Sequence, residues 1–232
     1  MQQKKIPGIM GGMGPSATRD LYALIIQNTP ANIDQDHLEI IIHSYPHHDR
    51  TAAILTKEES PLPTLITSAK KLKEAGADFV AVPCNTAHFF IPDIQKRTGI
   101  PFVDMIEETS REIEGLGQKK VGLLSTSATA KTGLYQKSIS CDVVIPSDES
   151  IESEMEAIYG EHGIKAGVEY ENSQYNKDLL LGVIDELKEK GAEAIILGCT
   201  ELPLCLTASD TDIPLINPTE ILSKAIIREA TE

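Results

Sequence analysis

The chain alternates between short apolar runs and longer segments in which apolar residues recur every three or four positions. A short apolar run that ends at glycine or polar residues is typical of a buried strand, and the longer spacing is typical of an amphipathic helix. The pattern predicts strands at residues 6–10, 37–44, 79–83, 100–103, 121–124, 143–146 and 195–197. It predicts helices at residues 16–26, 64–75, 89–96, 177–190 and 220–230, and another near Met105. Strands and helices that alternate in this way indicate parallel β-α-β units with helices on both faces of a sheet.

Landmarks in the first half of the chain recur in the second half. Cys199 follows Cys84 by 115 residues, and Gly191 follows Gly76 by the same 115 residues. Residues 100–103, an Ile-Pro phrase followed by two apolar residues, return as residues 213–216. Landmarks that repeat in the same order at nearly constant separation indicate a duplicated unit.

We therefore predict an α/β fold of two similar β-α-β lobes with mainly parallel sheets, related by pseudo-twofold symmetry. The first lobe is assigned to residues 1–104 and 217–232, and the second to residues 105–216. Ligands of such sheets bind at the carboxyl ends of the strands. The active site is accordingly expected in the cleft between the lobes.

Composition narrows the classes of partner. The 232 residues carry a formal net charge of −14, which argues against a nucleic acid or a membrane surface, because both need clustered cations. No stretch approaches the roughly 20 apolar residues of a membrane-spanning helix, and the start of the chain does not resemble a signal peptide. Four irregularly spaced cysteines without a Cys-x-x-Cys pair predict free thiols and no zinc site. A cytoplasmic protein is expected.

The two cysteines of the repeat carry the candidate chemistry. Cys84 and Cys199 each end an apolar strand, where a single cysteine is most often a small buried hydrophobe. Two at equivalent points of a duplicated fold can approach one ligand from opposite sides. One thiolate would remove the proton from Cα while the other thiol returns one, which inverts the configuration. Such a pair needs thiolates with a depressed pKa, and we expect helix starts after both cysteines and nearby cations to supply it.

Other polar residues at strand ends are candidate substrate contacts, and each has a simpler alternative. The turn at residues 11–15, which holds Met13, can offer helix N–H groups to an anion or be only a tight turn. Arg50 and Lys165 suit the side-chain carboxylate of an acidic substrate, although exposed, solvated cations are common. The remaining candidates are hydroxyl, amide and carboxyl groups that hold the substrate, cap a helix or orient a neighbour, namely Asn85, Thr86, Ser127, Thr129, Thr200 and Glu201.

Three histidines and an aspartate lie close together in the sequence, but they do not predict a metal site. His43, His47, His48 and Asp49 fall on a strand end and an extended loop, where adjacent side chains do not converge on one ion. His88 follows the first cysteine motif, but the second copy has no histidine at that position. We therefore predict a structural role for His88 at a helix start.

These motifs resemble the signatures of the aspartate/glutamate racemase superfamily. The resemblance rests on Gly11-Gly12-Met13-Gly14-Pro15, on Pro83-Cys84-Asn85-Thr86-Ala87-His88 and on Gly198-Cys199-Thr200-Glu201. It extends over nearly the whole chain, because Asp49-Arg50-Thr51 and Ile164-Lys165-Ala166-Gly167 match as well. The glycine turn, Arg50 and Lys165 narrow it toward aspartate racemases, since glutamate racemases have an Asp-Ser pair where Gly12-Met13 stands here.

The resemblance implies racemisation without pyridoxal phosphate or metal, with Cys84 and Cys199 as the acid/base groups, and it implies a homodimer. The expected function is interconversion of L- and D-aspartate. A broader racemase that also accepts glutamate is the nearest alternative, and a maleate-isomerase-like enzyme would also use two cysteines. A two-lobed binding protein without chemistry, or a pyridoxal phosphate enzyme that uses Lys165, is a less favoured alternative.

Overall fold

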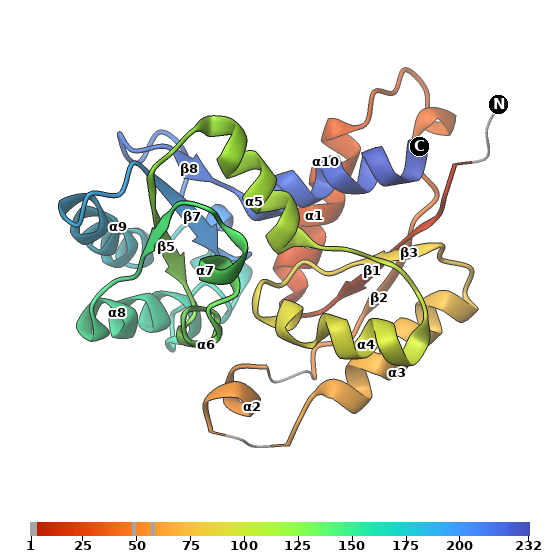
Figure 1. Ribbon diagram of the computed structural model, residues 1–232, viewed down its shortest axis with the longest axis horizontal. Helices are drawn as coiled ribbons and strands as arrows, with labels where there is room; N and C mark the ends of the chain where they lie inside the picture. Colours follow the sequence, from red (N-terminus) through yellow and green to blue (C-terminus); the bar gives the residue numbers. More distant parts are fainter. Residues whose placement is uncertain (1–3, 48–49, 57–58) are drawn as a thin grey trace. The chain divides into compact units, whose positions relative to one another are not determined.

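The computed structural model describes residues 4–47, 50–56 and 59–232 (Figure 1). Strands and helices alternate along it, as the sequence pattern predicts. Contacts divide the chain into two compact units. Unit 1 comprises Met1–Glu108 and Thr219–Glu232, and unit 2 comprises Thr109–Pro218.

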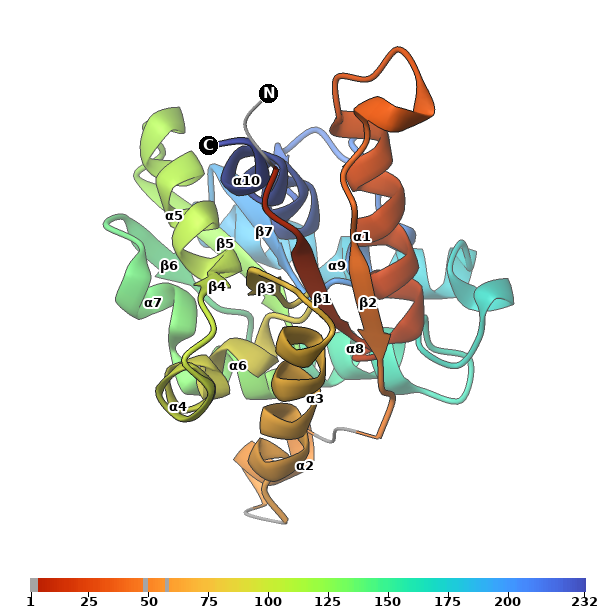
Figure 2. The ribbon, with the colours of Figure 1, turned by 90° about the vertical axis from the view of Figure 1, so that its right-hand side faces the viewer.

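Unit 1 contains a parallel sheet of four strands. They are β1 (Pro7–Gly11), β2 (Ile41–Ser44), β3 (Phe79–Ala81) and β4 (Phe102–Val103). Their order is β2-β1-β3-β4, which Figure 2 shows from right to left. The helices of this unit are α1 (Pro15–Asn28), α2 (Thr51–Leu55), α3 (Leu62–Glu74), α4 (Ile91–Thr98) and most of α10 (Pro218–Thr231), with short 3-10 turns η1 (Asp34–Asp36) and η2 (Thr86–Phe90).

Unit 2 repeats this sheet strand by strand. β5 (Lys120–Ser125), β6 (Asp142–Val144), β7 (Ala194–Gly198) and β8 (Leu215–Ile216) are parallel in the order β6-β5-β7-β8. Its helices are α6 (Ser127–Thr132), α7 (Leu134–Ser138), α8 (Asp148–Tyr159) and α9 (Gln174–Glu189), with 3-10 turns η3 (Val168–Tyr170) and η4 (Leu202–Leu204). Helix α5 (Met105–Leu116) carries the chain from unit 1 into unit 2. The predicted α/β fold with a duplicated β-α-β design is confirmed.

Several strands have other bounds than those predicted, and helix α8 was not predicted. The strand predicted at 37–44 is shorter, because β2 pairs with β1 only from Ile41 onward, and the position on β1 before that pair is Pro7, which has no N–H to donate. The strand predicted at 143–146 lies at Asp142–Val144. The acidic tract that begins at Asp148 forms helix α8, whose first turn places Asp148 and Glu149 at the positive end of the helix dipole.

The central strands of the unit 1 sheet, β1 and β3, are buried on both faces, as is usual for a parallel sheet. One face packs against α1 and α10, where Ile9 contacts a cluster that includes Leu21 and Leu222 (Figure 1). The other face packs against α3 and α4, and there Met10 belongs to a cluster that includes Leu65 and Ile94. Neighbouring residues of β1 thus point to opposite faces, and this explains why the strand reads as a continuous apolar run. No helix in the described part of the chain is long and apolar enough to cross a membrane.

Gly12 is required where β1 ends. Its φ is +95°, and a Cβ at this position would lie 2.5 Å from backbone atoms of Tyr45. We expect Gly12→Ala to lower the free energy of unfolding by about 2–4 kcal/mol, from left-handed strain and overpacking together. Urea unfolding measures the effect. Gly182→Ala in α9 is the matched control: a Cβ there meets nothing within 4 Å, and the change should stabilise the helix by about 0.5–1 kcal/mol. Equal unfolding curves for Gly12→Ala and the wild type would contradict the argument.

Candidate active site

The candidate site residues of each unit lie where a ligand site is expected in this topology. In the order β2-β1-β3-β4, the chain continues from β1 to β2 at one edge of the sheet and from β3 to β4 at the other edge. Ligands of such sheets bind at the carboxyl ends of the two strands where the direction changes, here β1 and β3. In unit 1 these ends lead into Met13 and Cys84. In unit 2 the equivalent strands, β5 and β7, lead into the hydroxyl-rich segment 125–129 and Cys199.

Cys84 is held in a tight, buried turn after β3. Its N–H donates to the carbonyl of Val82 at 2.8 Å, and its side chain belongs to the core between the sheet and α3. Asn85 and Thr86 follow at the start of η2 and are also buried. The expected helix after this cysteine is therefore first a 3-10 turn, and α4 begins only at Ile91.

His88 fixes the backbone of this turn. Its Nε2 accepts a hydrogen bond from the N–H of Met105 at 3.0 Å, so its Nδ1 carries the proton and donates to the carbonyl of Cys84 at 2.9 Å. The ring is buried, and burial lowers its pKa despite the opposing charge of Asp104. A neutral imidazole thus ties Cys84 to the start of α5, which is the structural role predicted for this residue.

We expect His88→Leu to destabilise the protein by about 2–4 kcal/mol, because a buried carbonyl and a buried N–H lose their partners. The variant should also lose part of the pH dependence of stability. The folded pKa of His88 lies below its ordinary value, so below about pH 6.5 the unfolded chain takes up a proton that the folded chain does not. This contribution to stability is present above about pH 6.5 and is lost as the pH falls. Urea unfolding at several pH values tests both effects, and identical pH slopes in variant and wild type would contradict the second.

The glycine turn of unit 1 brings Met13 and Arg50 together. Arg50 precedes α2, its side chain is buried, and its Nη2 donates to the carbonyl of Met13 at 3.3 Å. Thr18 on α1 braces the same turn, because its Oγ1 accepts from the N–H of Gly12 at 2.9 Å and donates to the carbonyl of Gly14 at 3.1 Å. Thr18 is not among the residues predicted from the sequence, although its position four residues after Gly14 in a helix start is a signal for such a bond. The neighbouring Asp49, part of the quoted motif, lies outside the described residues.

Cys199 in unit 2 belongs to a buried chain of charged and polar groups. Its Sγ–H donates to Oε2 of Glu201 at 3.2 Å, and Thr200 Oγ1 donates to the same oxygen at 3.3 Å. The other carboxylate oxygen of Glu201 forms an ion pair with Nζ of Lys165. The side chain of Lys165 is 15% exposed and that of Glu201 is 2% exposed. Lys165 is therefore not the solvated lysine of the simpler alternative, and Glu201 orients both Thr200 and the thiol.

The predicted depression of the cysteine pKa values is wrong for Cys199. Burial raises the pKa of Cys199 well above its usual range, and the negative charge of Glu201 raises it further. Lys165 and the N–H of Glu201 act in the opposite direction but do not prevail. The helical segment that follows is η4, a single 3-10 turn from Leu202 to Leu204, and so short a turn has little dipole to offer. Cys199 is a protonated thiol in this environment.

The pKa of Lys165 is governed by the same partner. Burial is the largest single cause and lowers the pKa of this ammonium. The charge of Glu201, the charges of Cys199 and Tyr159 and the hydrogen bond to Glu201 together outweigh burial and leave the pKa raised. The Nζ also lies 5.6 Å from the centroid of the Tyr159 ring, a favourable cation–π distance. Lys165 therefore stays charged next to the thiol of Cys199.

The hydroxyl-rich segment 125–129 after β5 contains the residue that caps α6 and two candidate substrate contacts. Thr126 caps α6, because its side chain accepts a hydrogen bond from the N–H of Thr129 at 3.3 Å. Thr129 is fully buried, and Ser127 is half-buried with its Oγ 3.4 Å from the sulfur of Met155. Glu154, which is not among the residues predicted from the sequence, is 1% exposed and accepts from the N–H of Ser125 at 3.2 Å.

Burial raises the pKa of Glu154 well above its ordinary value, although the hydrogen bond from the N–H of Ser125 acts in the opposite direction. The signal for it was available in the sequence: Ile151, Glu154 and Ile158 have the helical spacing of one inward face of α8. Glu154 thereby links α8 to the end of β5 and positions the segment that contains Ser127 and Thr129. Among the described residues no group of three His, Cys, Asp or Glu side chains is arranged to hold a metal ion, and His48 and Asp49 fall outside them.

Within each unit, then, the structure gathers the candidates that the sequence identified. Unit 1 holds Cys84, Asn85 and Thr86 at the end of β3, and Met13 with Arg50 at the end of β1. The candidates of unit 2 lie at the ends of β5 and β7, with Lys165 brought to Cys199 through Glu201; they are Ser127, Thr129, Lys165, Cys199, Thr200 and Glu201.

Comparisons with known proteins match the chain across both units. A model of the Asp/Glu/hydantoin racemase family matches residues 10–226. The broad specificity amino-acid racemase RacX of Bacillus subtilis is 29% identical over 226 residues, which cover 95% of this chain and 96% of that protein. The solved structure of Picrophilus torridus aspartate racemase has a TM-score of 0.85 at 30% identity and covers 98% of this chain and 94% of its own. An aspartate racemase homologue from Pyrococcus horikoshii has a TM-score of 0.76 at 30% identity, with coverages of 99% and 100%.

Proposed function

The chain belongs to the Asp/Glu/hydantoin racemase family, and from this premise we propose that it interconverts L- and D-aspartate without a cofactor. The observation that carries the substrate is the match to an aspartate racemase over 98% of this chain at a TM-score of 0.85. The observation that carries the chemistry is the repeat itself, which sets Cys84 and Cys199 at the ends of equivalent strands, β3 and β7.

In the proposed reaction the two cysteines act on opposite faces of Cα. The Sγ of one cysteine, as a thiolate, takes the Cα proton and leaves a planar carbanion. The Sγ–H of the other cysteine then gives its proton to the opposite face, which inverts the configuration and leaves the second cysteine as the thiolate. The protonated Cys199 described above suits the donor in the first half of this cycle. The mechanism requires one cysteine from each unit at a single substrate molecule.

Glu201 would act through Cys199. Its carboxylate accepts the Sγ–H bond at 3.2 Å and thus aims the thiol. When Cys199 has given up its proton, Lys165 remains as the nearby positive charge that stabilises the thiolate. Glu201 is therefore assigned as a positioning residue, and this assignment is preferred over direct capture of the substrate ammonium.

Arg50 and Lys165 would attract the side-chain carboxylate of aspartate. Arg50 is 8% exposed, and a buried guanidinium holds a carboxylate more strongly than an exposed one does. One of the three Nζ protons of Lys165 serves Glu201, which leaves donors for a second carboxylate. The α-carboxylate, the amino group and the developing negative charge would be held by neutral groups at the strand ends, namely Met13 through its turn, Asn85, Thr86, Ser127, Thr129 and Thr200.

Proton exchange at Cα tests the proposed function. L-aspartate, D-aspartate and both enantiomers of glutamate would each be incubated with the protein in deuterated buffer without added cofactor. We expect deuterium at Cα and formation of the opposite enantiomer of aspartate, measured by mass spectrometry after chiral chromatography. If neither acid acquires deuterium or inverts, the protein is not the proposed racemase.

A broader amino-acid racemase is the second candidate. The similarity to the broad specificity racemase of Bacillus subtilis, at 29% identity over 95% of this chain, favours it. The same experiment distinguishes the two candidates through kcat/KM. A value for aspartate well above the values for glutamate and for neutral amino acids supports the first, and similar values for several amino acids support the second.

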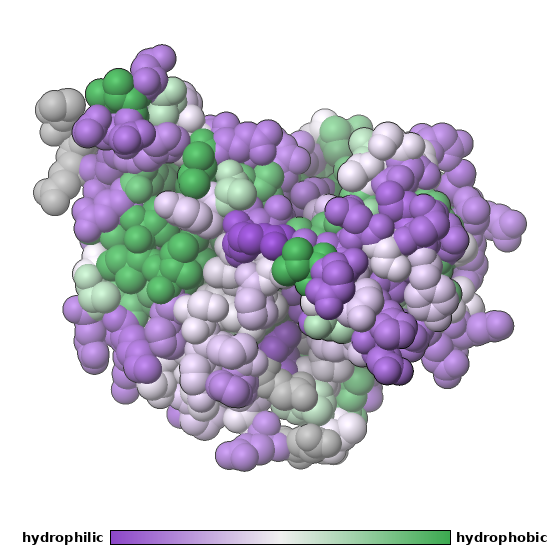
Figure 3. Space-filling model, turned by 180° about the vertical axis from the view of Figure 1, so that it is seen from behind, coloured by the Kyte–Doolittle hydropathy of each residue, from purple (hydrophilic) through white to green (hydrophobic). Residues whose placement is uncertain are grey.

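We further propose that the enzyme works as a homodimer in the cytoplasm, where a reducing environment would keep both thiols available. Support for a second copy comes from exposed hydrophobic side chains on one face of unit 1. On α1, Tyr22 and Ile26 are 43% and 45% exposed, and Ile42 on β2, 41% exposed, faces the same side of the sheet as Ile9. Figure 3 shows hydrophobic surface on this unit. Sedimentation of the full chain measures its mass in solution.

A further inference from the structure

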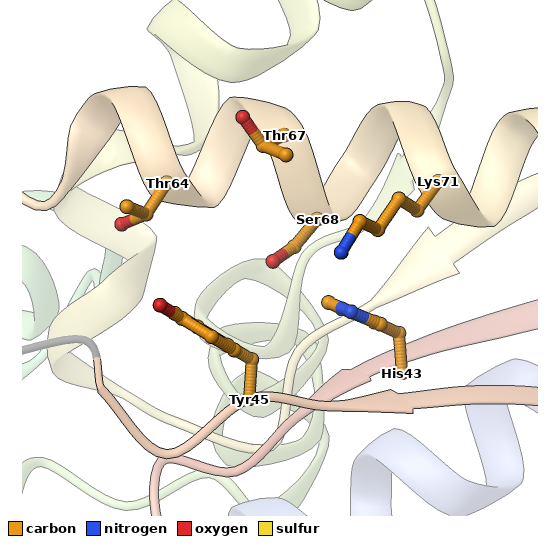
Figure 4. A pocket seen from close by; sticks show the side chains of 6 residues that line it. All are labelled: His43, Tyr45, Thr64, Thr67, Ser68 and Lys71. Atoms are coloured by element: carbon orange, nitrogen blue, oxygen red, sulfur yellow. The ribbon is translucent and has the colours of Figure 1, made fainter.

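A small hollow lies between β2 and α3 in unit 1, on the edge of the sheet. Each residue that lines it carries a polar group, while most of the surface that faces the space comes from carbon atoms, and the residues come from two sides. His43 and Tyr45 lie at the end of β2 and just after it, and Thr64, Thr67, Ser68 and Lys71 lie on α3 (Figure 4). The hollow holds about 130 Å³. One water needs roughly 10–15 Å³ and drug-sized ligands fill about 300–1,000 Å³, so the space suits a small polyatomic ligand.

The composition of this lining is unusual for its place in the fold. Ile41, two residues before His43 on the same face of β2, packs into the hydrophobic cluster beneath α3. A structural continuation of that face would place apolar residues at positions 43 and 45. Instead, the strand presents an imidazole and a phenol, and α3 presents hydroxyls and an ammonium (Figure 4). The hydroxyls of Thr64 and Thr67 already donate to the carbonyls of Pro61 and Pro63 on their own helix, so His43 and Lys71 are the donors on which a ligand would depend. No carboxylate lines the hollow among the residues that the structure describes.

His43 carries a polar atom without a partner. Its Nδ1 is buried and has no hydrogen bond among the described residues. Its ring is stacked on Tyr45 with an interplanar angle of 9°, which limits its freedom to rotate toward solvent. A buried nitrogen left without a hydrogen bond costs free energy, and a bound ligand would remove that cost.

Lys71 gives the hollow its charge. Figure 4 shows its side chain and that of Ser68 pointing toward His43 from α3. The Lys71 charge is close enough to help lower the pKa of His43, after burial as the larger cause. A cation beside a neutral imidazole leaves a local positive charge in a protein whose net charge is −14. An anion is the ligand that such a place attracts.

We propose that this hollow between β2 and α3 is a binding site for a small oxyanion of the phosphate class, held between Lys71 and His43. Donors that approach from a strand and from a helix match a tetrahedral anion, whose oxygens point in several directions, better than a flat carboxylate. Lysine is a common partner of phosphate as a point charge. The site is built from other residues than the proposed racemase site, and it stands whether or not that function is correct.

Titration of the full-length protein with inorganic phosphate tests the proposal. Calorimetry measures the affinity, and the NMR signals of the His43 ring, assigned by their absence in His43→Gln, report the location. We expect saturable binding and a shift of the His43 signals. Lys71→Ala should weaken the affinity about tenfold or more, because a charge-assisted hydrogen bond is lost. Lys70→Ala, the same change at the neighbouring position of α3, is the control and should change the affinity less than about twofold.

Two further ligands identify the source of the phosphate group. If glycerol 3-phosphate binds and shifts the same signals, the site recognises a phosphate monoester. If only inorganic phosphate binds, the ligand of the site is free phosphate. Acetate that binds as tightly as phosphate would overturn the phosphate assignment. The absence of saturable binding at millimolar phosphate, or equal affinity of Lys71→Ala and wild type, would overturn the site.

Discussion

Replacing either Cys84 or Cys199 with alanine is expected to abolish the inversion of aspartate. Each thiol is the only proposed acid or base on its face of Cα, so its loss removes a contribution of about 10²–10⁴ in rate, and the second face of Cα then has no proton donor. Racemisation followed by circular dichroism or chiral chromatography measures the loss. The buried position of both cysteines makes a folding check by thermal unfolding part of the experiment.

The remaining cysteine of each variant gives a sharper result. It can still take the Cα proton from the one enantiomer that presents this proton to it. We therefore expect deuterium exchange without inversion, and for opposite enantiomers in the two variants. Cys141→Ala, which alters a partly exposed cysteine of unit 2, is the control and should leave turnover unchanged. Near-normal inversion in either active-site variant, or exchange of the same enantiomer in both, would contradict the two-base assignment.

Glu201→Gln is expected to lower the pKa of Cys199 and to reduce kcat at the same time. After burial, the charge of Glu201 is the largest cause that raises the pKa of Cys199. Its removal should move the midpoint of thiol alkylation to lower pH. An amide oxygen accepts the Sγ–H bond more weakly than a carboxylate does, so the thiol is aimed less well. We expect kcat to fall about tenfold, which is less than the roughly 10²–10⁴ that an acid/base group itself contributes. Iodoacetamide labelling over a range of pH, quantified at Cys199 by tandem mass spectrometry, measures the shift.

Lys165→Met is expected to shift the pKa of Cys199 in the opposite direction from Glu201→Gln. Lys165 lowers the pKa of Cys199, so this variant should move the alkylation midpoint to higher pH. Removing one partner of a buried ion pair also costs stability, commonly about 3–5 kcal/mol. The double variant Glu201→Gln with Lys165→Met removes both charges and should recover part of that stability without recovering activity. Midpoints that move in the same direction in both single variants would contradict the proposed electrostatics.

Most strands and helices could be predicted, because the positions that they bury are apolar and recur with the period of a strand or a helix. β1 and β7 are buried along their whole length, so they read as apolar runs. Helix α3 shows one apolar stripe, with Leu65 and Leu72 buried. The exceptions have local causes that a pattern does not contain, such as Pro7, which lies one position before the first pair of β1 with β2. Helix α8 was not predicted, because most of its residues are acidic or polar and only a few inward residues show the helical spacing.

The candidate site was predictable in its members but not in its interactions. The duplicated strand motif is enough to identify Cys199 as the equivalent of Cys84, because equivalent strands of a repeat end in equivalent places. The sequence places Lys165 and Glu201 far apart, and no spacing rule relates them. Their ion pair, and the bond from Cys199 to Glu201, exist because the loop after α8 folds back over the end of β7.

The α/β class, the repeat and the equivalence of the two cysteines follow from residue type and periodicity along the chain. The electrostatic state of the site follows from the folded arrangement and not from any local pattern. A pKa depends on burial and on the charges that surround the group in space, so Cys199, expected to have a depressed pKa, has a raised one. The same holds for the hollow at His43 and Lys71, which arises only where a strand edge and a helix face meet.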